Sequence, residues 1–136
     1  MTFLLDTCVL SDFARGEAGT LARLKDASPS EISISAISVM EVEYGLSLDA
    51  ARAKALAPVM RAILGAVRIL PYGAEDARAS ASLRASLEKK GRPIGAYDVL
   101  IAGAALSRGL VLVTSNVREF GRIAVLRIEN WRQARE

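Results

Sequence analysis

Four short apolar runs rich in β-forming residues constrain the fold of this chain more than any other feature. They lie at residues 3–5, 32–34, 67–70 and 110–113. Each run is continuous and does not alternate between apolar and polar residues, which is typical of strands covered by helices on both faces. Helical periodicity fills the sequence between the runs. The pattern therefore predicts an α/β protein with a parallel sheet of four to five strands flanked by helices.

The remaining elements follow from the same periodicity. We expect helices at residues 9–15, 21–27, 38–48, 50–65, 75–90 and 98–108, and a short last strand at residues 124–128. The 136 residues contain no repeat or linker and fit one domain, 1–136. No apolar run reaches the roughly 18 residues of a membrane-spanning helix, and Asp6 interrupts the first run before a secretion signal can form. A single cysteine also agrees with a reducing compartment, so we expect a soluble cytoplasmic protein.

Composition excludes most kinds of catalytic chemistry. The chain has no histidine and one cysteine, which rules out serine or cysteine nucleophiles paired with histidine, and zinc sites built from histidine or cysteine. It also lacks the glycine-rich phosphate loops of nucleotide-binding enzymes. Carboxylates with a hard metal ion are the main reagents left. The net charge of +3 and the isoelectric point near 9.4 favour an anionic partner such as nucleic acid.

Three polar residues lie at predicted strand-to-helix junctions. Asp6 follows the first strand, Glu41 lies in the first turns of the helix after the second, and Asn116 comes two residues beyond Thr114 at the end of the fourth. Ligands of open parallel sheets bind outside the carboxyl ends of the strands, so we expect these residues to converge. Asp98, at the start of a helix, reaches the same place only if that helix packs across the sheet.

The helical phase of Glu41 leaves two packing arrangements open. At about 100° per residue, Glu41 shares an apolar stripe with Ile37, Met40, Tyr44 and Leu48. A second apolar stripe, on the other side of the helix, contains Val39, Val42 and Leu46. If the first stripe meets the core, Glu41 needs a cation, a hydrogen-bond donor or a raised pKa. We expect this second stripe to offer a surface that binds a second copy of the chain or a partner.

Structural roles compete with a catalytic one at several positions. Aspartate is a favoured helix cap, which applies to Asp6 and more strongly to Asp98, while Asn116 is an ordinary turn residue. The segment 89–93, with two lysines, a glycine, an arginine and a proline, has the composition of a helix end. Trp131 is expected to anchor the C-terminal tail by packing.

Four segments in order resemble the motifs of PIN-domain toxins of the VapC type. They are residues 4–11 (LLDTCVLS), 37–45 (ISVMEVEYG), 91–102 (GRPIGAYDVLIA) and 112–120 (LVTSNVREF). The end of the chain, residues 126–131 (LRIENW), is similar to the tail of these toxins. Each segment is short, but four in the same order and spacing are specific, and together they extend over nearly the whole chain.

The resemblance implies a metal-dependent endoribonuclease. Asp6, Glu41 and Asp98 match the three acids that hold Mg²⁺ or Mn²⁺ in this family, and Thr114 matches a hydroxyl residue beside the metal. Where many relatives have an aspartate, this chain has Asn116, so a second metal would be held through water or with help from an auxiliary acid. We expect that acid to be Glu119. Cys8 likewise replaces an asparagine that is common in the family.

The resemblance also implies partners. The substrate is expected to be RNA, specifically tRNA and in particular initiator tRNA, with a VapB-like antitoxin as inhibitor and a homodimer as the assembly. Basic side chains are expected to contact phosphates and so to position the RNA; they are Lys89, Lys90, Arg92, Arg118 and Arg122.

Two other functions stay open at this point. A haloacid-dehalogenase-like phosphatase also begins with an aspartate after the first strand, but it needs a second aspartate where this chain has Cys8. A non-enzymatic nucleic-acid-binding or scaffold module explains the basic isoelectric point and treats the acids as helix caps. The phase of Glu41 and the four ordered motifs count against it.

Overall fold

One parallel sheet organises the molecule. The computed structural model describes residues 2–132, in which five strands pair in the order β3-β2-β1-β4-β5. They are β1 (Phe3–Leu5), β2 (Ile32–Ser35), β3 (Arg68–Leu70), β4 (Val111–Val113) and β5 (Ile128–Glu129). All four pairs of neighbouring strands are parallel. The predicted α/β fold with a parallel sheet is therefore confirmed.

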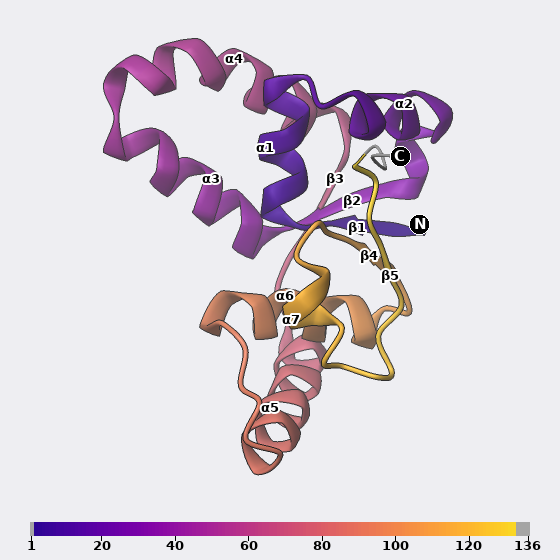
Figure 1. Ribbon diagram of the computed structural model, residues 1–136. Helices are drawn as coiled ribbons and strands as arrows, with labels where there is room; N and C mark the ends of the chain where they lie inside the picture. The colour runs from indigo at the N-terminus through magenta and orange to yellow at the C-terminus, as the bar shows by residue number, and fades with distance from the viewer. Residues whose placement is uncertain (1, 133–136) are drawn as a thin grey trace.

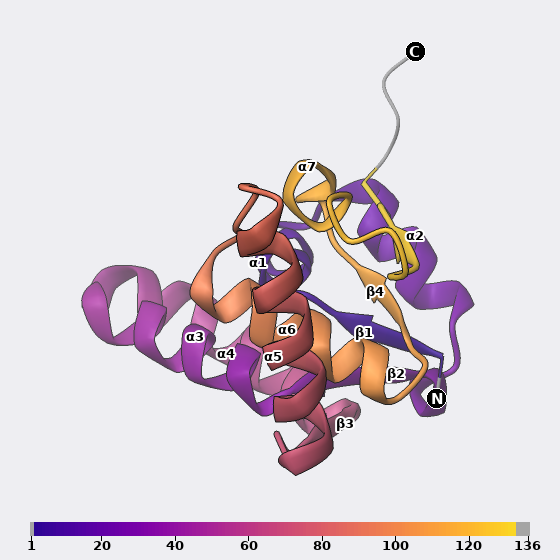
Figure 2. The ribbon, with the colours of Figure 1, turned by 90° about the horizontal axis from the view of Figure 1, so that it is seen from below.

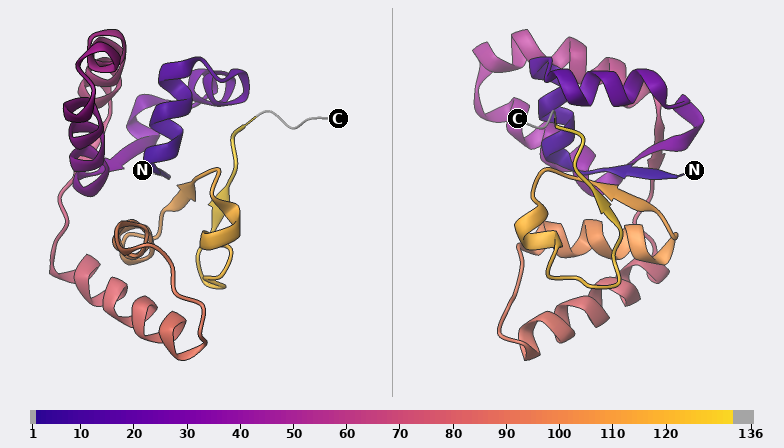
Figure 3. Two further views of the ribbon diagram at one scale, coloured as in Figure 1. Left: turned by 60° about the vertical axis from the view of Figure 1, so that its left-hand side comes forward. Right: turned by 45° about the vertical axis from the view of Figure 1, so that its right-hand side comes forward.

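Helices cover both faces of the sheet (Figures 1 and 3). One layer, above the sheet in Figure 1, contains α1 (Thr7–Arg15), α2 (Ala18–Asp26), α3 (Ala36–Leu48) and α4 (Ala50–Ala66). The other layer, below it, contains α5 (Ala74–Lys89), α6 (Ala96–Ser107) and the short α7 (Val117–Phe120). A 3-10 turn, η1 (Pro29–Glu31), precedes β2. The inner strands β1 and β4 are accordingly apolar toward both layers, whereas the edge strand β3 exposes Arg68 and Ile69.

The two adjacent leucines of β1 show how the sheet divides the core. Leu4 packs in the cluster beneath α5 and α6, whereas Leu5 packs in the cluster beneath α1, α3 and α4. Both side chains are fully buried. Successive residues of a strand point to opposite faces, so a continuous apolar run is what a strand between two helical layers requires.

The predicted elements agree with the structure except near the C-terminus. The six predicted helices are present, with ends displaced by up to three residues, and α7 and η1 were not predicted. The last strand was expected at residues 124–128 but is only Ile128–Glu129. Ile123 and Leu126 are buried through a turn, in which the Leu126 N–H donates to the Ile123 carbonyl at 3.1 Å. Their apolar character therefore reflected a packed turn and not a strand.

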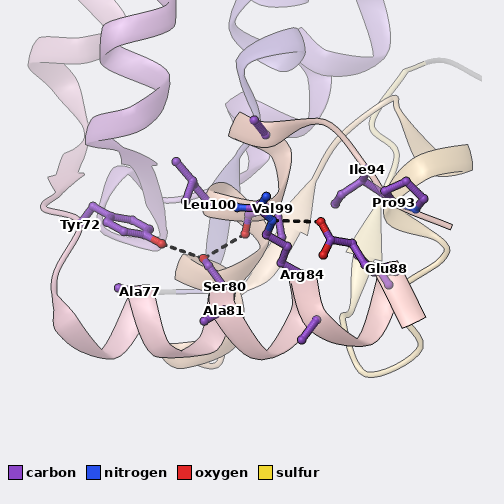
Figure 4. A pocket seen from close by; sticks show the side chains of 13 residues that line it. Tyr72, Ala77, Ser80, Ala81, Arg84, Glu88, Pro93, Ile94, Val99 and Leu100 are labelled. Carbon is purple, nitrogen blue, oxygen red and sulfur yellow. Dashed lines mark hydrogen bonds and ion pairs between the residues drawn. The ribbon is translucent and has the colours of Figure 1, made fainter. Parts of the chain in front are cut away.

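A close approach between α5 and α6 fixes the position of α6. Seen from below in Figure 2, the two helices lie against each other. A Cβ on Gly103 would lie 1.9 Å from Ser80 Oγ and 2.7 Å from the Ser80 backbone nitrogen, so glycine is required there. Ser80 Oγ donates to the Val99 carbonyl at 3.0 Å and accepts from the Tyr72 hydroxyl at 2.8 Å (Figure 4). These contacts hold α6 where it packs across the sheet.

The segment after α5 ends that helix as its composition predicts. Gly91 has φ of 69°, a left-handed conformation that favours glycine. The Gly91 and Arg92 N–H groups donate to the carbonyls of Glu88 and Leu87 at 3.0 and 2.9 Å. Among residues 2–132, no helix combines the length and apolar character needed to cross a bilayer.

Candidate active site

Asp6 lies at the junction of β1 and α1, where its side chain is held by three donors. Its Oδ1 accepts from the Thr7 N–H at 2.8 Å, which caps α1. Its Oδ2 accepts from Thr114 Oγ1 at 2.8 Å and from the Cys8 thiol at 3.3 Å. Burial raises the pKa of Asp6, and these hydrogen bonds oppose the rise. Asp6 is thus both a helix cap and a fixed, buried carboxyl group at the strand edge.

Glu41 is oriented by a residue of α1. Its Oε1 accepts from Thr7 Oγ1 at 2.8 Å, and the same hydroxyl lies 3.0 Å from Ser38 Oγ. Asp6 and Glu41 are therefore joined through Thr7, whose N–H binds one carboxylate and whose hydroxyl binds the other. The importance of Thr7 was missed in the sequence, although a hydroxyl residue directly after a strand-terminal aspartate was the available signal.

The structure decides between the two apolar stripes of α3. Val42 is buried, and Val39 and Leu46 pack against the same core cluster. Met40, Tyr44 and Leu48 are exposed. The choice that the sequence left open is thus decided: the second stripe meets the core, and Glu41 lies half-buried beside the exposed side of α3, with Thr7 as its hydrogen-bond donor. The suggestion that the stripe of Val39, Val42 and Leu46 offers a binding surface is wrong for the same reason.

Asp98, in the first turn of α6, lies close enough to the other acids for their charges to act on it. Burial and a hydrogen bond with Glu119, together with the negative charges of Asp6, Glu119 and Glu41, raise the pKa of Asp98 to about 7. These interactions show that α6 does bring Asp98 to the edge where β1 ends. Asp98 is thus within electrostatic range of Asp6 and Glu41, which are themselves joined through Thr7.

Glu119 and Asn116, at α7, complete the cluster. Asn116 Nδ2 donates to Glu119 Oε2 at 3.2 Å, and the Asn116 N–H donates to Thr114 Oγ1 at 2.9 Å. Hydrogen bonds with Asp98 and Asn116, followed by the charge of Arg122, lower the pKa of Glu119. Because the pKa of Asp98 is raised and that of Glu119 is lowered, Asp98 is the protonated member of a pair that shares one proton.

The thiol of Cys8 links two strand ends. Besides donating to Asp6, it lies 3.4 Å from the Ser115 nitrogen and 3.3 Å from Ser115 Oγ, both of which donate to the sulfur. Burial and the charge of Asp6 raise the pKa of Cys8, so the sulfur stays a thiol. Its place is that of a packing and hydrogen-bonding residue beside the site.

The chemistry of the donors suits a hard cation. Asp6, Glu41 and Asp98 offer carboxylate oxygens, and Thr114 and Asn116 add a hydroxyl and an amide, a set that matches Mg²⁺ or Mn²⁺. Within residues 2–132, however, no three acidic, cysteine or histidine side chains converge closely enough to ligate one ion as they stand. The acids interact with one another but do not form a closed ligand shell.

The basic residues predicted to contact phosphates differ in their exposure and in the contacts that they make. Four of them are exposed, so their charges are accessible to an approaching polyanion: Lys89, Lys90, Arg92 and Arg118. Arg122 is different, because its Nη1 donates to the Pro93 carbonyl at 2.8 Å and its charge acts on Glu119. Arg122 therefore joins the segment before α6 to α7.

Two pockets lie at different distances from the acids. A pocket of about 730 Å³ between α5 and α6, shown in Figure 4, is lined by Tyr72, Ser80, Arg84, Pro93 and Leu100 among others and includes none of the acids described above. A smaller one of about 210 Å³ between α1, α3 and α4 includes Thr7 and Glu41. Convergence of the carboxylates therefore locates the site better than the size of a cavity does.

Comparison with known proteins agrees with this geometry. The model of the PIN domain family matches residues 3–126. The chain belongs to the PIN domain family. This PIN domain is 37% identical over 131 residues, 96% of its length, to the tRNA(fMet)-specific endonuclease VapC of Salmonella typhimurium, of which it covers 98%. It is 34% identical to the protein of that name from Shigella flexneri, with the same coverage. The predicted resemblance to VapC toxins is confirmed.

Solved structures give the same result for the PIN fold. In the crystal structure of DNA-bound VapBC from Salmonella typhimurium, a chain superposes with a TM-score of 0.87 and 39% identity, over 96% of this chain and 98% of that one. In VapBC2 from Rickettsia felis bound to a promoter DNA fragment, the TM-score is 0.88 at 30% identity, with 96% and 99% covered. The family match selects the nuclease over the phosphatase that the first aspartate also allowed.

Proposed function

We propose that this PIN domain is a divalent-metal-dependent endoribonuclease toxin that cleaves tRNA. The observation that carries the proposal is the convergence of Asp6, Glu41 and Asp98, from three separate elements, at the edge where β1 ends. Three observations support it: Thr7 binds both Asp6 and Glu41, α3 contacts α6, and the charges of Asp6 and Glu41 act on Asp98. The names of the Salmonella and Shigella relatives support tRNA as the substrate class.

Asp6, Glu41 and Asp98 are the proposed ligands of Mg²⁺ or Mn²⁺. A divalent cation held there would supply a water of lowered pKa and neutralise charge that develops on the phosphoryl oxygens. Thr114 and Thr7 hold Asp6 and Glu41 in place through their hydroxyl groups. Asp98 has to lose its proton before it can act as a ligand. Glu119 is the proposed auxiliary acid, which would help Asn116 to hold a second metal ion.

Initiator tRNA, cut in its anticodon stem-loop, is the proposed substrate. Sequence-specific recognition of RNA mostly targets unpaired loops, because their bases can splay out of the stack. Lys89, Lys90, Arg92 and Arg118 are the proposed phosphate contacts, which position the RNA without reading its sequence. The proposed location of the reaction is the cytoplasm, where tRNA is found.

A VapB-like antitoxin is the proposed inhibitor, since the similar solved structures include VapBC complexes. We also propose a homodimer. Its interface has to lie elsewhere than the stripe of Val39, Val42 and Leu46, which belongs to the core. Growth arrest on expression of the chain alone, relieved by co-expression of an adjacent antitoxin gene, is the expected outcome in bacteria; unaffected growth would contradict the toxin assignment.

A nuclease assay tests the catalytic proposal. Purified protein is incubated with initiator tRNA and Mg²⁺, and parallel reactions contain excess EDTA or the variant Asp98→Asn. We expect cleavage with Mg²⁺, none with EDTA, and none with the variant. The matched control is Glu75→Gln, because this acid on α5 is highly exposed and pairs only with Arg78 among the described ion pairs; it should cleave like the wild type. Undiminished cleavage in EDTA would contradict metal dependence.

Mapping of new RNA 5′ ends tests the substrate. The protein is induced in bacteria, and ends are mapped across the transcriptome with Asp98→Asn as the blank. Ends concentrated in the anticodon loop of one or a few tRNAs agree with the proposal. Ends scattered over messenger RNA, with tRNA intact, would defeat it.

A further inference from the structure

Exposed apolar side chains adjoin two of the acids. Met40 immediately precedes Glu41 on α3, and Tyr97 immediately precedes Asp98 on α6. The side chains of Met40 and Tyr97 are 41% and 51% exposed. Because α3 and α6 are in contact and the charge of Glu41 acts on Asp98, the N-terminal halves of the two helices border a common region, and these two apolar residues adjoin it.

A third exposed apolar residue stands on the remaining element of the site. Val117, the first residue of α7, directly follows Asn116 and is 44% exposed. Asn116 contacts Glu119, which shares a hydrogen bond with Asp98. Three separate elements thus each place an exposed apolar side chain next to a polar group of the site. We call Met40, Tyr97 and Val117 the apolar rim.

The charges around the rim determine which ligand suits it. Most of the charged groups beside it are acidic and repel the phosphates of an approaching RNA; Arg118, which follows Val117 and is exposed, is a cation proposed above to contact a phosphate. The nearby cation Arg122 is engaged by the Pro93 carbonyl. An RNA whose phosphodiester enters the site therefore has few ion pairs to form at this point besides one with Arg118, and the uncharged parts of the nucleotides have to supply the other favourable contacts.

We propose that the apolar rim binds the unpaired nucleobases on either side of the scissile phosphate, with Tyr97 as the stacking residue. The inference rests on the proposed ribonuclease function, because that function brings a phosphodiester to Asp6, Glu41 and Asp98 and so brings its two flanking bases to the rim. An aromatic face stacks on any base, and only a splayed base can use it. The rim thereby selects single-stranded RNA over duplex.

The exposed residues farther along α3 are not part of this rim. Tyr44 and Leu48 lie three and seven residues beyond Glu41, one and two helical turns along α3 from it. They are available to a larger partner, whereas the bases next to the cleaved bond reach only the residues that adjoin the acids.

The test uses a synthetic anticodon stem-loop of initiator tRNA, with Mg²⁺, and four proteins: wild type, Tyr97→Phe, Tyr97→Leu and the control Val125→Ala. Val125 is a 73% exposed apolar residue in the turn between α7 and β5. Tyr97→Leu should raise KM about tenfold, the effect of one lost stacking contact, with little change in kcat. Tyr97→Phe keeps the ring and should match the wild type, as should Val125→Ala. Thermal melting verifies that all four are folded.

A second substrate isolates the base that stacks. An abasic nucleotide is placed in turn on each side of the bond that the wild type cuts. At one of these positions the wild type should lose about tenfold in kcat/KM, and Tyr97→Leu should lose no more, because its contact is already absent. If the abasic nucleotide lowers kcat/KM of Tyr97→Leu by the same factor as that of the wild type, the two losses are independent and the inference is overturned. An unchanged KM for Tyr97→Leu on the intact stem-loop would also overturn it.

Two further outcomes would also overturn the proposed role of the rim. If Tyr97→Leu keeps its KM but changes its mass in solution, the rim is a contact between copies of the chain and the inference is wrong. If the wild type cleaves neither the stem-loop nor total RNA in Mg²⁺, the proposed function itself fails, and the rim has no nucleobase to bind.

Discussion

The guanidinium group of Arg132 binds the carboxylate of Asp12 through two hydrogen bonds, Nε to Oδ2 at 2.8 Å and Nη2 to Oδ1 at 2.9 Å. Asp12 is on α1 and almost completely buried, and Arg15 donates to the same carboxylate at 2.8 Å. The preceding residue, Trp131, is buried and packs edge-on against Phe3 with ring centroids 5.2 Å apart. Residues 131 and 132 are thereby fixed to β1 and α1, which confirms the prediction that Trp131 acts as a packing anchor.

Arg132→Ala should lower the free energy of unfolding by about 1–2 kcal/mol. The substitution removes two charge-assisted hydrogen bonds from a buried carboxylate, but Arg15 stays as a partner and the arginine side chain is 46% exposed, which limits the loss. Urea denaturation measures it. Arg78→Ala is the control, because that arginine and its partner Glu75 are both highly exposed, and its effect should stay below about 0.5 kcal/mol. Equal effects of the two substitutions would contradict the structural role.

Gly103→Ala should destabilise the protein by about 1–3 kcal/mol or more. The added methyl group would collide with both the side chain and the backbone of Ser80, so α5 and α6 would have to move apart. Gly65→Ala is the matched control within a helix: a Cβ there meets nothing within 4 Å, and the change should stabilise α4 by about 0.5–1 kcal/mol. Thermal unfolding of both variants provides the comparison. A Gly103→Ala protein as stable as the wild type would show that the helices are not in close contact.

Asp98→Asn should become more stable than the wild type as pH rises. The pKa of Asp98 is raised to about 7 in the folded protein, against about 3.9 in an unfolded chain. The folded protein therefore favours the protonated form of Asp98. The contribution of this group to the free energy of unfolding is fully present below about pH 4 and is lost as pH rises through 7. Asparagine does not ionise. The melting temperature of the variant should therefore increase relative to that of the wild type as the pH is raised from 5 to 8 in EDTA.

Asp76→Asn tests the sign of that pH dependence. Burial opposes ionisation of Asp76, but the Gly73 N–H, the Ser107 hydroxyl and Arg108 outweigh it, so the pKa of Asp76 is lowered. Stability from this carboxylate is present above its unfolded pKa and lost as the medium becomes acidic. The free energy of unfolding of the variant should therefore be lower than that of the wild type at neutral pH and similar to it in acid. If both aspartate variants shift in the same direction with pH, the assignment of Asp98 is wrong.

Mg²⁺ or Mn²⁺ should raise the melting temperature of the wild type at pH 7.5. A ligand that binds only the folded state stabilises it in proportion to the logarithm of its concentration, by about 2.7 kcal/mol at one hundred times the dissociation constant. Asp98→Asn removes one proposed ligand and should shift much less, whereas Glu75→Gln should shift like the wild type. Differential scanning fluorimetry with a metal titration measures all three. Identical shifts for the three proteins would indicate binding elsewhere.

The strands and the central acids were predictable because both follow from local patterns. Continuous apolar runs identified β1 to β4, and the carboxyl ends of parallel strands meet by geometry, which placed Asp6 near Glu41. The orientation of α3 was not predictable in the same way. Both of its stripes are apolar, and the choice between them depends on the packing of Val42 beneath the helix, which is a property of the whole fold.

The region around α7 was the least predictable. Four residues are too few to show helical periodicity, so Glu119 was recognised only as an auxiliary acid from the family pattern. Its proton-sharing contact with Asp98 joins α7 to α6, and no local sequence signal encodes a pairing of that kind. The length of β5 was overestimated because buried turn residues such as Ile123 are as apolar as those of a strand.

The strand order has a consequence for the protein during its synthesis. β1, the first strand to leave the ribosome, becomes the central strand and pairs with both β2 and β4. Asp6 reaches its bond with Thr114 only after more than a hundred further residues have been translated. An incomplete nascent chain therefore cannot bring Thr114 to Asp6, so a prematurely terminated copy of this PIN domain would lack the proposed nuclease activity.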